Sequence, residues 1–193
     1  MQQLTHLSLV NSLQADGEGN PPAAAYAVLT ASSKLQSLNI NGCTLPAGAW
    51  QQIFPAGRQL PCLQSLNIAV VRDSSSDWYA PAPQGSLLVS CCPGLQSLDI
   101  RHLQYSAELL APLQELSGLQ ELCLGAHSFG GQAEGFAAVC PGVVCKLTQL
   151  QKLTLSCPHT PQEILPYLTS LQHLTTLGYY GPLGGGRQGP LHR

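Results

Sequence analysis

A six-residue pattern, Leu-x-x-Leu-x-Leu with Ile allowed at the last position, recurs seven times along this chain of 193 residues. The copies begin at Leu4, Leu35, Leu63, Leu95, Leu119, Leu150 and Leu174, and the last one ends in Tyr179. Apolar residues at the fourth and sixth positions, separated by a polar one, predict a short strand with one buried face. A single copy is too short to enclose its own leucines. We therefore predict that successive copies stack side by side and bury a shared column of leucines.

The consensus and its spacing of 24 to 32 residues resemble the leucine-rich-repeat superfamily over nearly the whole chain. Residues 92–100 and 40–43 resemble the cysteine-containing repeats of F-box-type intracellular proteins, with Cys43 at the Asn/Cys position three residues after the strand. The other copies differ there and have Ser12, Val71, Leu103, His127, Pro158 and Pro182. The resemblance implies an α/β solenoid, or horseshoe, with a parallel sheet on the concave side and short helices or turns on the convex side.

The repeats occupy residues 1–183, and we expect the glycine-rich residues 184–193 to form a disordered tail. Short convex helices are predicted at residues 23–32, 46–54 and 106–116, and another after the capping-box sequence at residues 160–163. Trp50 is predicted to pack against the leucine column rather than to contact a ligand. We interpret the polar segment 73–83, which contains Trp78 and Tyr79, as a lid over the solenoid flank, with a partner contact as the alternative.

The two ends of the pattern lack the polar capping segments that solenoids usually carry. The first copy starts at Leu4, and the last is followed by a glycine-rich segment. An open end would expose leucines and unpaired backbone groups. We therefore expect that the native solenoid is longer than this chain, or that a partner contacts its ends, with end-to-end contact through the uncapped ends as one such arrangement.

Composition argues against several classes of function. Charged residues make up 9% of the chain and its net charge is −2, so no basic surface is available for nucleic acid. The sequence has no run of 18 apolar residues that could span a membrane and no apparent signal peptide. The eight cysteines lack the spacing of a disulfide framework, which favours a reduced, cytoplasmic protein over an extracellular receptor domain.

Sequence signatures of enzymes and metal sites are absent as well. The glycines at residues 184–189 lack the Lys-Ser/Thr sequence of a phosphate-binding loop. Cys91 with Cys92, and Cys140 with Cys145, lack the paired C-x2-C spacing and companion histidines of a zinc site. Cys123 is the one candidate nucleophile on the outward strand face, and we interpret it as a small residue tolerated there. We therefore expect no catalytic residue, no metal and no cofactor.

The candidate binding surface is the outward face of the predicted strands. Its first three copies carry small, neutral, hydrogen-bonding side chains, whereas charged residues gather in copies four to six. Arginine and aromatic residues supply most of the binding energy at protein interfaces. The partner-binding candidates are therefore Asp99, Arg101, Glu121, Lys152 and Tyr180. The alternative is that these are solvated strand residues that pair with each other.

We interpret the chain as a non-catalytic module for protein–protein interaction. The resemblance to cysteine-containing repeats implies the substrate-recognition part of an F-box-type ubiquitin ligase adaptor, although no F-box helices precede the repeats. The alternatives are a cytoskeletal or cilium axoneme scaffold and, in a different class, the regulatory part of an enzyme. The sequence leaves open whether a protein partner binds the concave sheet or the convex loops.

Overall fold

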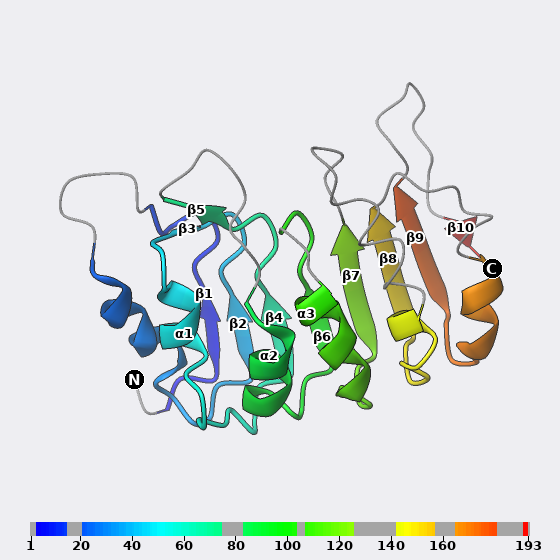
Figure 1. Cartoon of the computed structure of the whole chain (residues 1–193), viewed down its shortest axis with the longest axis horizontal. Coiled ribbons are helices and arrows are strands. Elements are labelled where there is room, and N and C mark those ends of the chain that lie inside the picture. Colours follow the sequence, from blue (N-terminus) through cyan, green and yellow to red (C-terminus); the bar gives the residue numbers. More distant parts are fainter. Residues whose placement is uncertain are drawn as a thin grey trace.

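The seven repeated segments form neighbouring strands of one sheet. The computed structural model describes residues 3–14, 21–74, 83–103, 107–125, 142–156, 165–180 and 191–192. The strands lie parallel and follow each other in chain order along the length of the molecule (Figure 1). They are β1 (His6–Ser8), β2 (Ser37–Asn39), β4 (Ser65–Asn67), β6 (Ser97–Asp99), β7 (Glu121–Gly125), β8 (Lys152–Ser156) and β9 (Thr176–Tyr180). The predicted stacking of the copies into a parallel sheet is confirmed.

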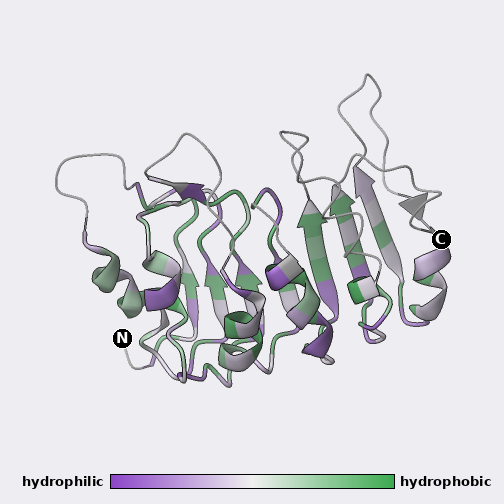
Figure 2. Cartoon of the chain, viewed as in Figure 1, coloured by the Kyte–Doolittle hydropathy of each residue, from purple (hydrophilic) through white to green (hydrophobic). Residues whose placement is uncertain are grey.

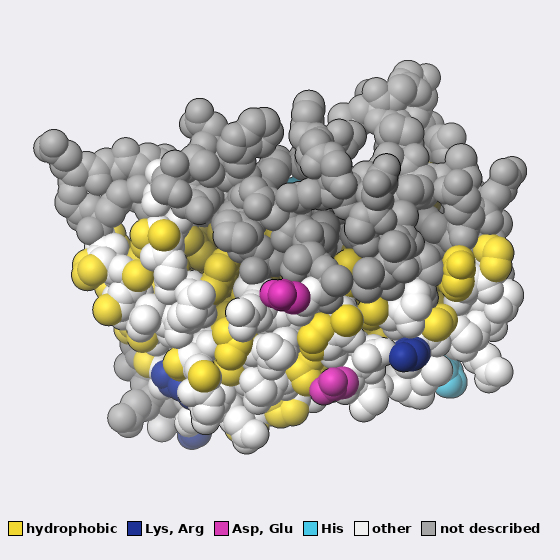
Figure 3. Space-filling model, in the orientation of Figure 1, with side chains coloured by type: hydrophobic (Ala, Val, Ile, Leu, Met, Phe, Trp, Pro, Cys, Tyr) yellow, Lys and Arg dark blue, Asp and Glu magenta, His cyan; other side chains and the backbone are white. Residues whose placement is uncertain are grey.

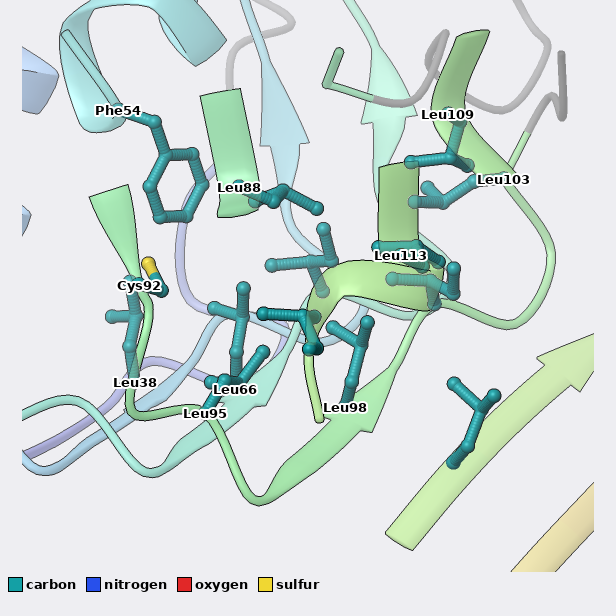
Figure 4. Packing of buried hydrophobic residues seen from close by; sticks show 14 of the residues in the cluster. Leu38, Phe54, Leu66, Leu88, Cys92, Leu95, Leu98, Leu103, Leu109 and Leu113 are labelled. Carbon is teal, nitrogen blue, oxygen red and sulfur yellow. The ribbon is translucent and has the colours of Figure 1, made fainter. Parts of the chain in front are cut away.

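Equivalent positions of successive copies are paired across this sheet. Leu38 pairs with Leu66, Leu66 with Leu98, and Leu98 with Leu122, and the same position continues through β8 and β9. These four leucines are at most 1% exposed. Figure 4 shows Leu38, Leu66 and Leu98 packed together beside the helices. A fully buried leucine contributes about 1.5–3 kcal/mol, so this column is a major source of stability.

Short helices cover one face of the sheet (Figure 1). They are η1 (Ala23–Thr30), α1 (Ala49–Ile53), α2 (Gly85–Cys91), α3 (Ala107–Leu110), η2 (Ala111–Glu115) and η3 (Leu165–Ser170). The helices predicted at residues 23–32, 46–54 and 106–116 are present with altered bounds. In α1 the helix begins later than predicted because Gly48 has a left-handed φ of 80°, which interrupts the helical backbone. The capping-box residues 160–163 lie outside the described residues.

A left-handed residue ends the strand segment in the first four copies. Asn11, Gly42, Val70 and His102 each stand two residues after the last apolar strand position, with φ of 53°, 69°, 60° and 61°. Each of their amide N–H groups donates a hydrogen bond of 2.8–3.0 Å to a carbonyl of the next copy, so the ladder continues through the turn. The turn redirects the chain, and the residue that follows in copies two to four is buried: Cys43, Val71 or Leu103.

Two very short strands follow this turn and form a second sheet. β3 (Thr44–Leu45) pairs in parallel with β5 (Arg72–Asp73). This pair was not anticipated from the sequence. Most of the segment 73–83, including Trp78 and Tyr79, lies outside the described residues. Its interpretation as a lid over the solenoid flank therefore stays a prediction.

Aromatic residues of α1 pack into the leucine core as predicted. Trp50 is 8% exposed, and its ring stacks on that of Phe54 with centroids 6.3 Å apart and an interplanar angle of 18°. Ile53 and Phe54 are fully buried. Their shared face closes the helix layer over the leucine column, and this supports the packing interpretation of Trp50 over a ligand contact.

The apolar column is less well covered at the two ends of the sheet. Leu4, Leu7 and Leu9 in the first copy, and Leu177 and Tyr179 in the last, are only partly buried. Figure 2 shows strongly hydrophobic residues along β7 and β8 and a weaker hydrophobic character on β9. At this end β10 (Leu191–His192) pairs antiparallel with β9. Apart from these two residues, the segment 184–193, for which a disordered tail is predicted, lies outside the described part, and the tail stays a prediction.

Candidate functional site

The outward-facing side chains of β6 to β9 and of Arg101 form the candidate site, which we call the β6–β9 surface. The strand register arranges them in three rows that run across the strands. The first row is Ser97, Glu121, Lys152 and Thr176; the second is Asp99, Cys123, Thr154 and Gly178; the third is Arg101, Gly125, Ser156 and Tyr180. All five partner-binding candidates lie on this surface, within four adjacent strands of the sheet.

Asp99 and Arg101 form a bidentate ion pair. Arg101 Nη2 donates to Asp99 Oδ2 at 2.7 Å, and Arg101 Nε donates to Asp99 Oδ1 at 3.0 Å. The same Oδ1 atom also accepts the backbone N–H of Arg101 at 3.2 Å. The side chains are 14% and 35% exposed for Asp99 and Arg101, respectively, so the pair is largely shielded from solvent. The side-chain hydrogen bonding to Asp99 is the largest cause of the raised pKa of Arg101, and the guanidinium therefore stays charged.

The backbone bond made by Asp99 is a repeated feature of the sheet. Asn39 Oδ1 accepts the N–H of Asn41, and Asn67 Oδ1 accepts the N–H of Ala69, both at 3.1 Å. In copies two to four a short polar side chain thus accepts a backbone hydrogen bond just after the end of the strand. Asp99 accepts the equivalent backbone hydrogen bond with a carboxylate oxygen, and the same carboxylate also binds the guanidinium of Arg101.

Glu121 and Lys152 form a second, looser pair. Lys152 Nζ lies 3.9 Å from Glu121 Oε2, and the two side chains are about half exposed. The hydroxyl of Ser97 donates to the same Glu121 oxygen at 3.4 Å. Exposed pairs of this kind contribute only about 0–1 kcal/mol because water and salt screen the charges. Both side chains are therefore available to a partner at little cost.

Small residues separate Arg101 from Tyr180 in the third row. A Cβ atom at Gly125 would lie 2.9 Å from Ser156 Cβ and 3.4 Å from Arg101 Cγ. A side chain at Gly125 would therefore collide with Ser156 and come into van der Waals contact with the aliphatic stem of Arg101. Tyr180 is 56% exposed and lies close enough to add to the raised pKa of Arg101, after the Asp99 hydrogen bond.

Cys123 lies between the two ion pairs and is half-buried. Burial raises the pKa of its thiol, and the negative charge of Asp99 raises it further. A reactive cysteine needs the opposite shift, because the thiolate is the nucleophile. The geometry therefore supports the interpretation of Cys123 as a small surface residue rather than as a catalytic one.

The described part of the chain contains no group of three or more His, Cys, Asp or Glu side chains placed to hold a metal ion. The cysteines described there are free thiols: Cys43, Cys62, Cys91, Cys92, Cys123 and Cys145. Within the same ranges no helix is long and apolar enough to cross a membrane.

The rest of the described surface is poorer in charge. On the outward faces of β2 and β4 the polar contact is between neutral amides, with Asn41 Nδ2 donating to Asn67 Oδ1 at 3.5 Å. Figure 3 shows the side covered by helices, where the few charged side chains are scattered among apolar and neutral ones. Among the seven parallel strands of the large sheet, the charged residues thus gather on the β6–β9 surface; the short strand β5 of the second sheet carries Arg72 and Asp73.

The structure adds two features to the sequence-based description of the site. It pairs Asp99 with Arg101, and it places Gly125 beneath the arginine stem. The first could have been expected, because residues two apart on a strand share a face. The second depends on the register between β6 and β7, which no single segment reveals.

Comparisons with known proteins give a fold and no family assignment. No family model matches the chain, and no curated protein matches it either. Among solved structures it is similar to an internalin C2 from Listeria monocytogenes, with a TM-score of 0.54 and 17% sequence identity. The similarity covers 91% of this chain and 61% of that chain, so this chain spans less than two thirds of the internalin. Internalin C2 is a leucine-rich-repeat protein, and the likeness supports that fold for this chain.

Proposed function

We propose that this chain is a non-catalytic protein-binding module whose partner contacts the β6–β9 surface. The leucine-rich-repeat likeness supports a role in protein–protein interaction at the level of the fold. The observation that carries the proposal is the arrangement of Asp99, Glu121, Lys152 and Tyr180 on four adjacent strands, with Arg101 in the turn that follows β6. One cation is held in fixed geometry, and an aromatic ring on the same row is more than half exposed. Arginine and tyrosine in such positions are typical binding hot spots.

The test is an affinity capture from the source cell extract, identified by mass spectrometry. Wild-type protein is compared with the variant that combines Asp99→Ala, Arg101→Ala, Glu121→Ala and Lys152→Ala. A matched control combines Ser37→Ala and Ser65→Ala, which change the same face of the sheet on β2 and β4. We expect the partner to be lost with the fourfold variant and retained by the control.

Melting curves for both variants separate a binding defect from unfolding. Equal capture by the folded fourfold variant would contradict the proposal and move the binding site away from the β6–β9 surface. Loss with the control and retention by the fourfold variant would move it to the neutral half of the sheet.

The finer hypotheses concern the biological setting and rest on the sequence. The substrate-recognition part of an F-box-type ubiquitin ligase adaptor is supported by the cysteine-containing repeats, and Cys43 is buried at the position that defines them. The cytoskeletal or cilium axoneme scaffold, a cytoplasmic location and end-to-end contact through the solenoid ends stay proposals of the same rank. Capture of ligase components would favour the first, and capture of tubulin or dynein-associated proteins would favour the scaffold.

A further inference from the structure

Of the seven parallel strands described in the large sheet, β1 is the one with an unpaired edge. It ends the strand order on one side, whereas β9 on the other side pairs with β10 (Figure 1). An unpaired edge is a template for another strand, and proteins usually block it with charged residues, proline or a bulge. Residues 4–13, which contain β1, include no lysine, arginine, aspartate, glutamate or proline. The sequence of β1 therefore does not protect this edge.

The ladder on the inner side of β1 shows which backbone groups lie on the open edge. The Leu9 N–H donates to the carbonyl of Asn39 in β2 at 2.8 Å. Alternate residues of a parallel strand turn their backbone groups to opposite neighbours. Leu7 and Leu9 thus face β2, and the N–H and C=O groups of His6 and Ser8 face the open edge. Among the described residues these groups have no backbone partner.

The apolar side chains of β1 are also less covered than their counterparts inside the sheet. Leu7 and Leu9 are only partly buried. Leu38 and Ile40, at the same two positions of the second copy, are fully buried. The second copy has a neighbouring strand on both sides, whereas β1 has one on a single side. A strand placed beside β1 would therefore bury further apolar surface of its leucines, which stabilises the contact.

The interior of the sheet shows which kind of segment fits beside such an edge. The edge of β4 that corresponds to the open edge of β1 is paired with β2. There the Ile40 N–H donates to the carbonyl of Asn67 at 2.9 Å, and the Ser65 N–H donates to the carbonyl of Gln36 at 3.0 Å. The same parallel contact recurs from β4 to β6 and from β6 to β7. A parallel strand with the repeated leucine pattern therefore matches this type of edge.

We propose that the open edge of β1 binds an extended segment of a partner protein that has the Leu-x-x-Leu-x-Leu/Ile pattern and adds to the sheet as a parallel strand. The segment donates a hydrogen bond to the carbonyl of Ser8, accepts one from the N–H of His6, and covers Leu7 and Leu9. In strand addition the main-chain bonds supply affinity, and the alternate side chains supply specificity. This site lies at the opposite end of the sheet from the β6–β9 surface and does not depend on the proposed function.

The test uses a synthetic peptide with the sequence of residues 33–42, which contains β2. Its affinity for the full chain is measured by fluorescence anisotropy, and we expect a dissociation constant below about 1 mM. Methylation of the peptide nitrogen that corresponds to Ile40 removes the donor to Ser8 and should weaken binding by about tenfold or more. The matched control is methylated at the nitrogen that corresponds to Asn39, which faces away from β1, and should bind within about twofold of the unmodified peptide.

Two variants of the protein test the position of the peptide. Ser8→Pro removes an N–H from the open edge and leaves the bonds from β1 to β2 in place, so it should weaken binding by about tenfold. Ser8→Ala keeps this N–H and should bind within about twofold of wild type. Melting curves show whether both variants are folded, and the methylated peptides decide the question if Ser8→Pro is not.

Three results would overturn the strand addition. One is the absence of binding by the unmodified peptide, and another is equal affinity of the two methylated peptides. The third is equal binding by wild type and folded Ser8→Pro, which would move the peptide to another part of the chain. The fourfold alanine variant should bind the peptide as wild type does, because its substitutions lie at the other end of the sheet. Loss of peptide binding in that variant would also contradict the site at β1, whereas the proposed function is tested separately with the captured partner.

Discussion

The first four copies of the repeat and the last three use the same leucine pattern but leave the strand differently. In the first four, the chain turns at a left-handed residue three positions after the end of a three-residue strand. In β7, β8 and β9 the strand runs on for two more residues, which places Gly125, Ser156 and Tyr180 in the ladder. The longer strands thus extend the outward surface just where the charged side chains gather.

In six of the seven copies the difference matches the residue three positions after the last apolar strand residue; the first copy has the exposed Ser12 there and still turns at Asn11. In copies two to four that residue is Cys43, Val71 or Leu103, and each is buried. Burial of an apolar side chain there favours an early turn into the core. The last three copies have His127, Pro158 and Pro182 at this position, residues that gain little from burial. An apolar residue at this position is therefore associated with the shorter strands of copies two to four, and a histidine or proline with the longer strands of the last three copies.

The largest expected effect is on the leucine column that the two regions share. Leu98 is 1% exposed and lies between Leu66 and Leu122 in the sheet. Leu98→Asp places a carboxylate in this column and should lower the free energy of unfolding by more than about 4 kcal/mol. We expect loss of the cooperative melting transition measured by circular dichroism.

The matched control is Thr176→Asp, which adds the same charge on the exposed face of β9 beside Lys152. It should leave the melting temperature within a few degrees of wild type. Similar destabilisation by both substitutions would show that Leu98 does not occupy the core.

A second prediction concerns Cys92, at the end of α2 in the helix-covered region. Burial raises the pKa of this thiol to about 12 from an ordinary value of 9.0. The folded protein therefore keeps the proton at pH values at which the unfolded chain releases it. The stability from this group is complete below pH 9 and is lost between pH 9 and about 12, by roughly 1 kcal/mol per pH unit.

Urea unfolding at several pH values measures this dependence. Cys92→Ala lowers the overall stability but should reduce the slope with pH, because the titrating group is gone. Equal slopes for wild type and Cys92→Ala would contradict the buried position of Cys92.

The smallest expected effect tests the early turn itself. Val70 adopts a φ of 60°, a conformation that strains a β-branched residue. Val70→Asn should raise the free energy of unfolding by about 1 kcal/mol, because asparagine tolerates the left-handed region and already occupies it at Asn11. The next residue, Val71, is fully buried, so Val71→Asn should be destabilising. Urea unfolding curves of the two variants should thus move in opposite directions, and a shift in the same direction would refute the assigned turn.

Sequence periodicity was sufficient for the sheet but insufficient for the details around it. The strands, the leucine column and the packing of Trp50 follow from patterns that each copy repeats. Helix α2 was not predicted, although Leu87, Leu88 and Cys91 have helical spacing. The polar segment 73–83 directly before it indicated a loop, and no helix was assigned after that loop. The positive φ of Val70 is one that β-branched residues disfavour. The burial of Val71 and the backbone hydrogen bond from Val70 to the next copy impose this turn in spite of that preference.

For the candidate site, too, the sequence predicted the positions of the residues but not their contacts. The outward positions of Asp99, Arg101, Glu121, Lys152 and Tyr180 follow from alternation along each strand. The pairing of Arg101 with Asp99 and the close approach of Ser156 to Gly125 depend on side-chain conformation and on contacts between copies, which no single segment of the sequence reveals.

The most direct test of the account compares two ends of one row of the sheet. Tyr180 ends the third row in the last copy, and Val10, 41% exposed, occupies the equivalent position in the first. The dissociation constant of the captured partner is measured by isothermal titration calorimetry for wild type, Val10→Ala and Tyr180→Ala. We expect binding to weaken by about tenfold or more with Tyr180→Ala and to stay within about twofold with Val10→Ala. Equal affinities for the two variants, or a larger loss with Val10→Ala, would contradict a partner bound at the β6–β9 surface.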